Sequence, residues 1–237
     1  YWYQLFTPRQ LTAMVTLSGL VRKVREDVQR DALAAGLSEA DAKDYARAVV
    51  TFLALALDRC SDYNNSLCCW VSAAQKVEHL FGRQAIPMVW DFGEADILGN
   101  SVGSWVTVVD RVTECLEALA PVPRSGHARP IDAARPWDGL NNVLVSTDPP
   151  YYDNIGYAAL SDFFYVWLRR TIGDLYPDLF ATILTPKDQE LVAAPERFNG
   201  DRLKAKQHFE AGFRRAFAVL REKMDPRFPL TVYYAFK

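Results

Sequence analysis

One stretch decides the expected fold: Asn141-Asn142-Val143-Leu144-Val145-Ser146-Thr147-Asp148-Pro149-Pro150-Tyr151-Tyr152. Its apolar run Val143–Ser146 is bounded by Asn-Asn before and Pro-Pro after, which is typical of a short buried strand in a parallel sheet. The β-branched and aromatic run Leu230–Phe236 predicts a second core strand. An α/β fold is therefore expected.

Helical patterns surround these strands. Thr7-Pro8-Arg9-Gln10 combines an N-cap residue, a proline at the first helical position and a glutamine three residues after the cap, so a helix should begin here and end near Gly36. Ser38 should cap a second helix. Four further helices are expected over Ser66–Leu80, Trp105–Leu119, Ser161–Ile172 and Asp201–Lys223. We thus expect a mainly helical lobe over residues 1–120 and part of an α/β core over 121–237.

Composition narrows the class of protein. The 237 residues are 50% hydrophobic and carry a net charge of −2, so a nucleic-acid partner would need a local basic patch. The longest apolar run, Ala48–Leu57, is too short for a membrane span, and the start lacks a signal-peptide pattern. The four cysteines lack paired metal-ligand spacing, so we expect buried thiols, no metal and a reducing, cytoplasmic setting.

The turn after the first strand carries the chemistry. Ligands of open parallel sheets bind outside the carboxyl ends of the strands. There, Asp148 offers hydrogen-bond acceptors, Pro149 and Pro150 stiffen the backbone, and Tyr151 offers a flat ring. Such a clamp suits methylation of an amino group on a nucleobase, because acceptors orient the nitrogen while the ring stacks on a flipped base.

Asp148-Pro149-Pro150-Tyr151 resembles motif IV of S-adenosyl-L-methionine-dependent amino methyltransferases. The stretches Thr147–Tyr157 and Leu160–Arg170 are more specifically similar to adenine-specific DNA methylases, which are large bacterial and archaeal proteins with an N-terminal domain of unknown function. Some of these are associated with phage defence. Further similar segments are Tyr3–Leu11, Arg83–Phe92 and Leu230–Lys237.

This resemblance implies a partial Rossmann-like methyltransferase core that methylates the adenine 6-amino group in DNA, with S-adenosyl-L-methionine as cofactor. It implies that Asp148 and the Pro149 carbonyl accept hydrogen bonds from the target amino group, while Pro150 completes the clamp and Tyr151 stacks on the base. Asp132, Thr147 and Asp148 are the expected cofactor-binding residues. The expected nucleic-acid contacts are Tyr151, Tyr152, Asn154 and Lys187.

The sequence departs from the family at its cofactor motif. The family's Gly-rich turn is missing, and the nearest echo, Phe198-Asn199-Gly200, lies in a polar loop with no strand before it. We therefore expect the chain to be a piece of a longer polypeptide, with this motif before Tyr1 and further strands after the last one. Those missing parts would be partners of the chain, together with DNA.

Two alternatives stay open. The same clamp is used on adenine and on cytosine, and on RNA as well as DNA, so an RNA amino-methyltransferase is one alternative. A non-catalytic nucleic-acid-binding module of a phage-defence system is another. The helical lobe is the expected target-recognition region, while basic residues from Arg197 to Lys223 form either a DNA-facing patch or a solvated helix face.

Overall fold

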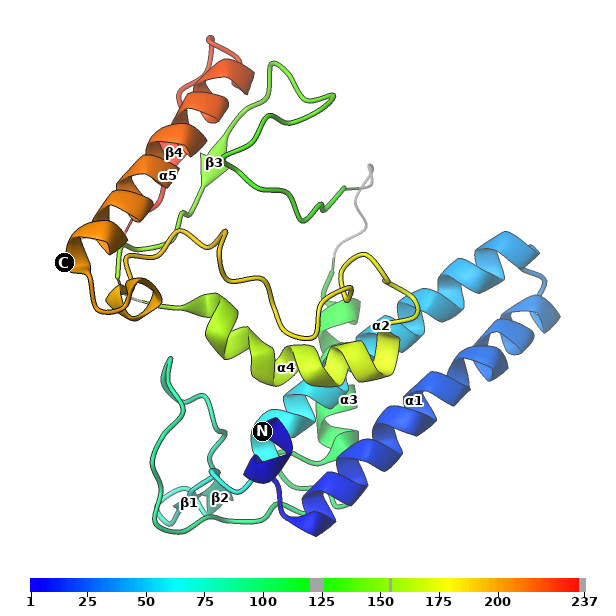
Figure 1. The fold of residues 1–237 in the computed structure, drawn as a ribbon. Helices are drawn as coiled ribbons and strands as arrows, with labels where there is room; N and C mark the ends of the chain where they lie inside the picture. The colour runs from blue at the N-terminus through cyan, green and yellow to red at the C-terminus, as the bar shows by residue number, and fades with distance from the viewer. Residues whose placement is uncertain (120–125, 154, 235–237) are drawn as a thin grey trace. The chain divides into compact units, whose positions relative to one another are not determined.

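A computed structural model describes residues 1–119, 126–153 and 155–234 of the chain. These residues form a mixed α/β structure in which long helices dominate and the strands are short (Figure 1). The chain divides into two compact units. Unit 1 contains Tyr1–Pro121 and Leu160–Thr185, and unit 2 contains Val122–Ala159 and Pro186–Lys237.

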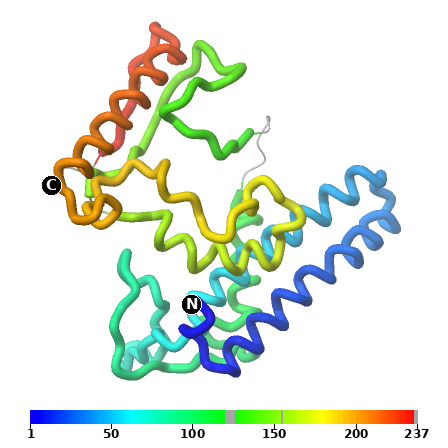
Figure 2. The backbone as a smooth tube through the Cα atoms, in the orientation of Figure 1, coloured from blue at the N-terminus to red at the C-terminus, as the bar shows by residue number. Residues whose placement is uncertain are grey.

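Unit 1 is built on a helical hairpin of α1 (Pro8–Ala34) and α2 (Glu39–Tyr63), whose traces run side by side in Figure 2. The predicted starts of both helices are confirmed. The Thr7 hydroxyl accepts a hydrogen bond from the Gln10 backbone N–H, the Gln10 side-chain oxygen accepts one from the Thr7 backbone N–H, and Ser38 caps α2. These caps satisfy backbone N–H groups that the first helical turn leaves without partners.

An aromatic core joins this hairpin to α4 (Tyr157–Ile172). Phe163 is 1% exposed and stacks on Phe6 at 5.9 Å between ring centroids, and Trp167 meets Phe6 edge to face at 5.4 Å. The buried hydroxyls of Ser18 and Thr171 are 3.0 Å apart. These contacts place Leu160–Thr185 in unit 1, whereas the sequence assigned it to 121–237. Linear order gave no sign that the segment returns to the helical core.

The predicted helix over Ser66–Leu80 is wrong. The chain forms instead an antiparallel pair of two-residue strands, β1 (Trp70–Val71) and β2 (Lys76–Val77). Side chains at the end of α2 override helix formation here. The buried Asp62 carboxylate accepts from the Phe81 backbone at 3.1 Å, and the Asn65 side chain accepts from Leu67. Such side-chain-to-backbone bonds compete with helical ones.

The remaining elements of unit 1 are the 3₁₀ helix η1 (Trp2–Leu5) and α3 (Trp105–Glu117). Ser104 caps α3, and the prediction of a helix there is confirmed. Residues 82–103 hold no helix or strand in the structure, as the sequence indicated. Within this segment the Glu94 carboxylate pairs with Arg9 at 2.9 Å, which fixes the loop on the start of α1.

Unit 2 contains a parallel pair of strands, β3 (Ser146–Thr147) and β4 (Thr231–Val232). Ser146 pairs with Thr231 and Thr147 with Val232, so the expectation of a parallel strand here is confirmed, although β3 covers Ser146–Thr147 and not Val143–Ser146. Between the two strands the chain forms η2 (Pro195–Phe198) and α5 (Arg202–Lys223), the latter capped by Asp201. Figure 1 shows α5 beside the strand pair.

The predicted burial of the first strand is observed only in part, and the second strand, predicted as a core strand, has both of its residues exposed. Val145 is 7% exposed, but Leu144 is 68% exposed. Alternate side chains of a strand point to opposite faces, so a face left without a covering layer exposes every second residue. The apolar run alone did not show that only one face is covered.

Two chemical expectations from composition are met in part. Cys60 and Cys68 are buried, and burial raises the pKa of each thiol to about 12, whereas Cys69 and Cys115 are exposed. Across the residues that the structure describes, every helix is too short or too polar to cross a membrane.

Candidate functional site

A hollow of about 660 Å³ lies in unit 2 beside the Asp-Pro-Pro-Tyr turn. Three segments line it: residues 130–134, the turn Asp148–Tyr151, and residues of the segment Pro186–Leu191. Tyr157, at the start of α4, completes the lining. Pockets of a few hundred to a thousand Å³ hold ligands the size of a nucleoside or a cofactor.

The turn leaves β3 directly, and its acid and aromatic ring contact each other. The Tyr151 hydroxyl donates a hydrogen bond to Asp148 Oδ1 at 2.8 Å. Because this bond to the carboxylate favours the protonated phenol, it raises the pKa of Tyr151. The Tyr151 ring also meets Tyr234 edge to face, with centroids 5.4 Å apart. In this arrangement the phenol occupies an acceptor of the Asp148 carboxylate.

Asp132 lies across the same hollow. Its Oδ1 accepts from the Ala134 backbone at 2.9 Å, and its Oδ2 lies 3.2 Å from Arg135 Nε. The Asp132 side chain is 26% exposed. A carboxylate held by two neighbours and still open to solvent can accept a further hydrogen bond from a ligand amino or hydroxyl group.

Glu190 ties the third segment to the elements around the hollow. Its carboxylate is 14% exposed, pairs with Arg197 and accepts from the Ala158 backbone N–H at 3.0 Å. Its carbonyl oxygen is 3.2 Å from His208 Nε2 on α5. The first N–H groups of a helix have no intrahelical partner, so Glu190 caps α4 from a remote loop. This fixes the wall that faces the turn.

The structure brings together some of the predicted site residues and leaves others aside. Asp132, Asp148, Pro149, Pro150 and Tyr151 all line the hollow. Thr147 is placed by the strand pairing, where its carbonyl accepts from Tyr233 at 2.8 Å.

The three other predicted nucleic-acid contacts differ in their surroundings. The Tyr152 ring packs edge to face on Phe209 of α5, at 5.1 Å between centroids, and its backbone φ is +28°. Lys187 belongs to the third segment, and its carbonyl accepts from Arg197 at 3.0 Å. Neither residue is among those lining the hollow. Asn154 lies outside the described residues.

Sequence reasoning missed the partners that come from distant segments. Glu190 sits in a short polar loop with no motif, and Tyr234 belongs to the second predicted strand, without any sign that it would meet Tyr151. Tyr157 lies within the stretch that resembles the methylases but was given no role. No local signal marks Glu190, since its function here depends on tertiary contacts.

The glycine echo of the family's cofactor motif does not form part of the hollow. Asn199 and Gly200 have φ values of +55° and +85° and end η2. Neither residue follows a strand, and neither lines the hollow. Among the described residues, no glycine lines the hollow. The structure therefore shows no Gly-rich loop there for a phosphate or for the methionine end of the cofactor.

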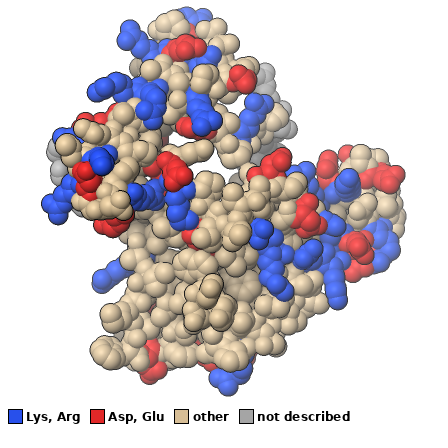
Figure 3. All heavy atoms as spheres, in the orientation of Figure 1, with Lys and Arg blue, Asp and Glu red and all other residues tan. Residues whose placement is uncertain are grey.

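The basic stretch of unit 2 alternates with acids. Lys204 pairs with Asp201 and Lys206 with Glu210, each at 3.6 Å. Figure 3 shows Lys and Arg side chains intermixed with Asp and Glu on the visible face. This mixture favours the interpretation of α5 as a solvated, ion-paired helix face over a purely basic patch.

Comparison of the chain with models of protein families, with curated proteins and with solved structures finds no match in any of the three.

Proposed function

We propose that this chain carries the base-binding part of an S-adenosyl-L-methionine-dependent methyltransferase acting on an exocyclic amino group, most specifically the adenine 6-amino group of DNA. One observation supports the proposal above the others. Asp132 and the Asp148–Tyr151 turn, singled out from separate segments of the sequence, line the same hollow at the carboxyl end of a parallel strand.

A Rossmann-like fold is part of the same proposal. The chain order is β3, α4, η2, α5, β4, and β3 pairs with β4 in parallel, so helices lie in the connection between two parallel strands, as in the crossover connections of such sheets. An extended sheet would place further strands beside β3 and β4. The exposed Leu144 would then find cover in a second helical layer.

The residues present fit one half of the cofactor. Asp132 and Asp148 offer acceptors for amino and hydroxyl groups, and Ile131 and Leu191 provide apolar walls for an adenosine ring. When bound, S-adenosyl-L-methionine supplies an electrophilic methyl group. The described residues of the hollow include no counterpart for its methionine end, which agrees with the missing Gly-rich motif.

The chain's own residues would act on the target base. Asp148 and the Pro149 carbonyl would accept the amino protons, which favours a more tetrahedral and nucleophilic nitrogen. For this, the Tyr151 hydroxyl must release Asp148, and the freed ring can stack on the flipped base. The amino nitrogen would gain the methyl group as the donor's sulfur–methyl bond breaks and the donor leaves as a neutral thioether, and the nitrogen would give up one proton, which water can take.

The first test is calorimetric titration of S-adenosyl-L-methionine into the chain, with Asp132→Ala as the variant and Asp138→Ala as its matched control. Asp138 is an exposed acid of the same unit that does not line the hollow. Binding that Asp132→Ala weakens and Asp138→Ala keeps would support the cofactor role. Equal binding by all three proteins would contradict it.

The second test is methyl incorporation into duplex DNA, single-stranded DNA and RNA, with Asp148→Ala as the variant. Assays should include a longer polypeptide that carries a Gly-rich cofactor motif, since the described residues of the hollow include no counterpart for the methionine end of the cofactor. Incorporation into adenine of DNA that Asp148→Ala abolishes supports the proposal. Incorporation into RNA alone would favour an RNA amino-methyltransferase. Nucleic-acid binding without methylation, unchanged by Asp148→Ala, would favour a non-catalytic module.

A further inference from the structure

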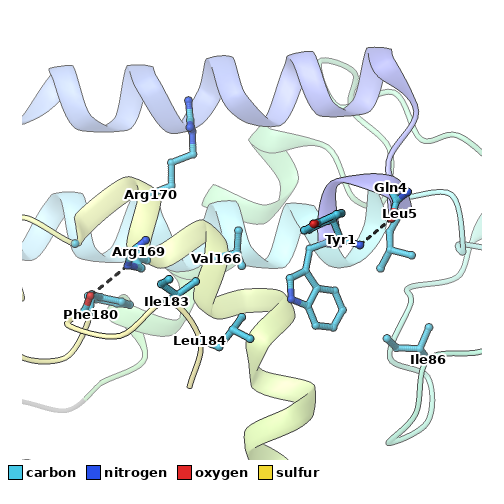
Figure 4. A pocket seen from close by; sticks show the side chains of 12 residues that line it. Tyr1, Gln4, Leu5, Ile86, Val166, Arg169, Arg170, Phe180, Ile183 and Leu184 are labelled. Atoms are coloured by element: carbon cyan, nitrogen blue, oxygen red, sulfur yellow. Dashed lines mark hydrogen bonds between the residues drawn. The ribbon is translucent and has the colours of Figure 1, made fainter. Parts of the chain in front are cut away.

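Unit 1 holds a larger groove than the one beside the turn. It measures about 1070 Å³, and its lining includes no residue of the Asp-Pro-Pro-Tyr turn. Its lining comes from η1, from the second half of α4, and from the segment that follows α4 (Figure 4). In that view Val166, Ile183 and Leu184 lie between Arg169 at one end and Tyr1 at the other.

The groove is apolar and its apolar side chains are open to solvent. Ile183 is 78% exposed and Ile86 is 43% exposed. Large apolar side chains concentrated in this way are uncommon on a surface that faces only water, and they mark interaction sites. Burying them would release ordered water at a favourable free energy.

The charges of the groove are all of one sign. Arg169 and Arg170, in the last turn of α4, both line it, and no Asp or Glu does so among the described residues. Arg169 Nε donates to the Phe180 carbonyl at 3.2 Å, which orients the guanidinium at the groove's end. Neither arginine forms an ion pair with any described residue, so both charges can meet an acidic partner.

The balance of these features favours a protein over a nucleic acid. Binding to a nucleic acid depends on many phosphate contacts, and two arginines in a mainly apolar groove supply few. Exposed Tyr and Arg side chains are instead enriched at protein interfaces, and Tyr1, Arg169 and Arg170 line this groove. We propose that this groove binds a peptide segment of a partner protein whose apolar side chains are followed by acidic ones.

The occupant's chemistry follows from the lining. Leu, Ile or Phe side chains would enter between Val166 and Ile183, and Asp or Glu would reach Arg169 and Arg170. Opposite charges at one end would also fix the direction in which the peptide lies. This inference does not depend on the proposed methyl transfer, because it uses residues of unit 1 only.

The test is a charge swap with two short fluorescent peptides of leucine, phenylalanine and glutamate, the second having every glutamate replaced by lysine. Fluorescence anisotropy should show that the full chain binds the acidic peptide more tightly. In the double variant Arg169→Glu, Arg170→Glu, the acidic peptide should bind at least tenfold more weakly and the lysine peptide more tightly. The matched control Arg214→Glu, Arg215→Glu changes two exposed arginines of α5 and should leave both affinities unchanged.

A second variant keeps the test independent of the arginine that contacts Phe180. Ile183→Asn removes an exposed apolar side chain, should leave thermal unfolding unchanged, and should weaken the acidic peptide at least tenfold. Equal binding of both peptides, no binding of either, or displacement by single-stranded DNA would overturn the proposal. So would light scattering that shows a dimer which Ile183→Asn dissociates, because a second copy would then fill the groove.

Discussion

A single methyl group added at Gly212 should disturb the candidate site, because it would displace a side chain that lines the hollow. Gly212 lies buried in α5, and a Cβ built there would stand 2.1 Å from Leu191 Cδ2 and 2.9 Å from Leu191 Cδ1. Ordinary contact begins at 3.4 Å, so in Gly212→Ala the Leu191 side chain must retreat by more than about 1 Å. Leu191 lines the hollow next to Glu190.

Two opposing effects set the size of the change. Replacing glycine by alanine within a helix stabilises by about 1 kcal/mol through propensity alone. Overpacking of a filled site costs about 1 to 3 kcal/mol. We expect the free energy of unfolding of Gly212→Ala to be lower than that of the parent by about 0 to 2 kcal/mol. Leu191→Ala removes the clashing atoms, so in that background Gly212→Ala should stabilise.

The decisive quantity is the coupling between the two substitutions, measured by urea unfolding of the four proteins of the double-mutant cycle. A coupling free energy of about 1 to 3 kcal/mol is expected, since the two side chains share one space. Ala211→Gly, on the exposed side of α5, measures the propensity term by itself. The reasoning is refuted if Gly212→Ala stabilises by the same amount with and without the Leu191 side chain.

Three further predictions concern single side chains. Asp58 is buried, and its Oδ1 has no hydrogen-bond partner among the described residues; burial raises its pKa well above the usual value, so the unfolded chain releases this proton at lower pH than the folded one. The protonated Asp58 carboxyl therefore stabilises the fold most below about pH 4, and the free energy of unfolding falls as pH rises, by up to about 1.4 kcal/mol per pH unit. In Asp58→Asn, the midpoint of urea unfolding should lack this decline. Tyr151→Phe should leave Asp148 without its phenol donor, so affinity for an adenine-containing oligonucleotide should rise severalfold in anisotropy titrations; an unchanged or lower affinity would contradict the exchange of partners at Asp148. Phe163→Ala should lower the unfolding free energy by about 3 to 5 kcal/mol, whereas Trp90→Ala, at a fully exposed site, should change it by less than about 0.5 kcal/mol.

Local chemistry in the sequence predicted the elements whose causes are local. Thr7 and Ser38 cap their helices through bonds to residues three positions away, so their patterns are readable from a short window. The Asp148–Tyr151 turn is likewise a local arrangement after a strand. The structure of the segment after Tyr63 was not predictable from a short window, because the Asp62 carboxylate accepts a hydrogen bond from the Phe81 backbone, nineteen positions later.

The candidate site was likewise predictable only where its residues are neighbours in the sequence. The acid, the prolines and the ring of the turn stand together in the chain, and their neighbours in space do not. Glu190 reaches the Ala158 backbone from 32 positions away, and Tyr234 meets Tyr151 from the far end of the described chain. A single sequence carries no local mark of such contacts. The return of Leu160–Thr185 to the helical core belongs to the same class.

That returning segment has a consequence for the order of events on the ribosome. The hairpin of α1 and α2 is complete at Tyr63, but Phe163 and Trp167, which close its core, follow roughly 100 residues later. At about 5 to 20 residues per second, the nascent hairpin would wait roughly 5 to 20 seconds with its apolar seam open. Chaperones that shield such seams during translation therefore have a defined window in which to act on this chain.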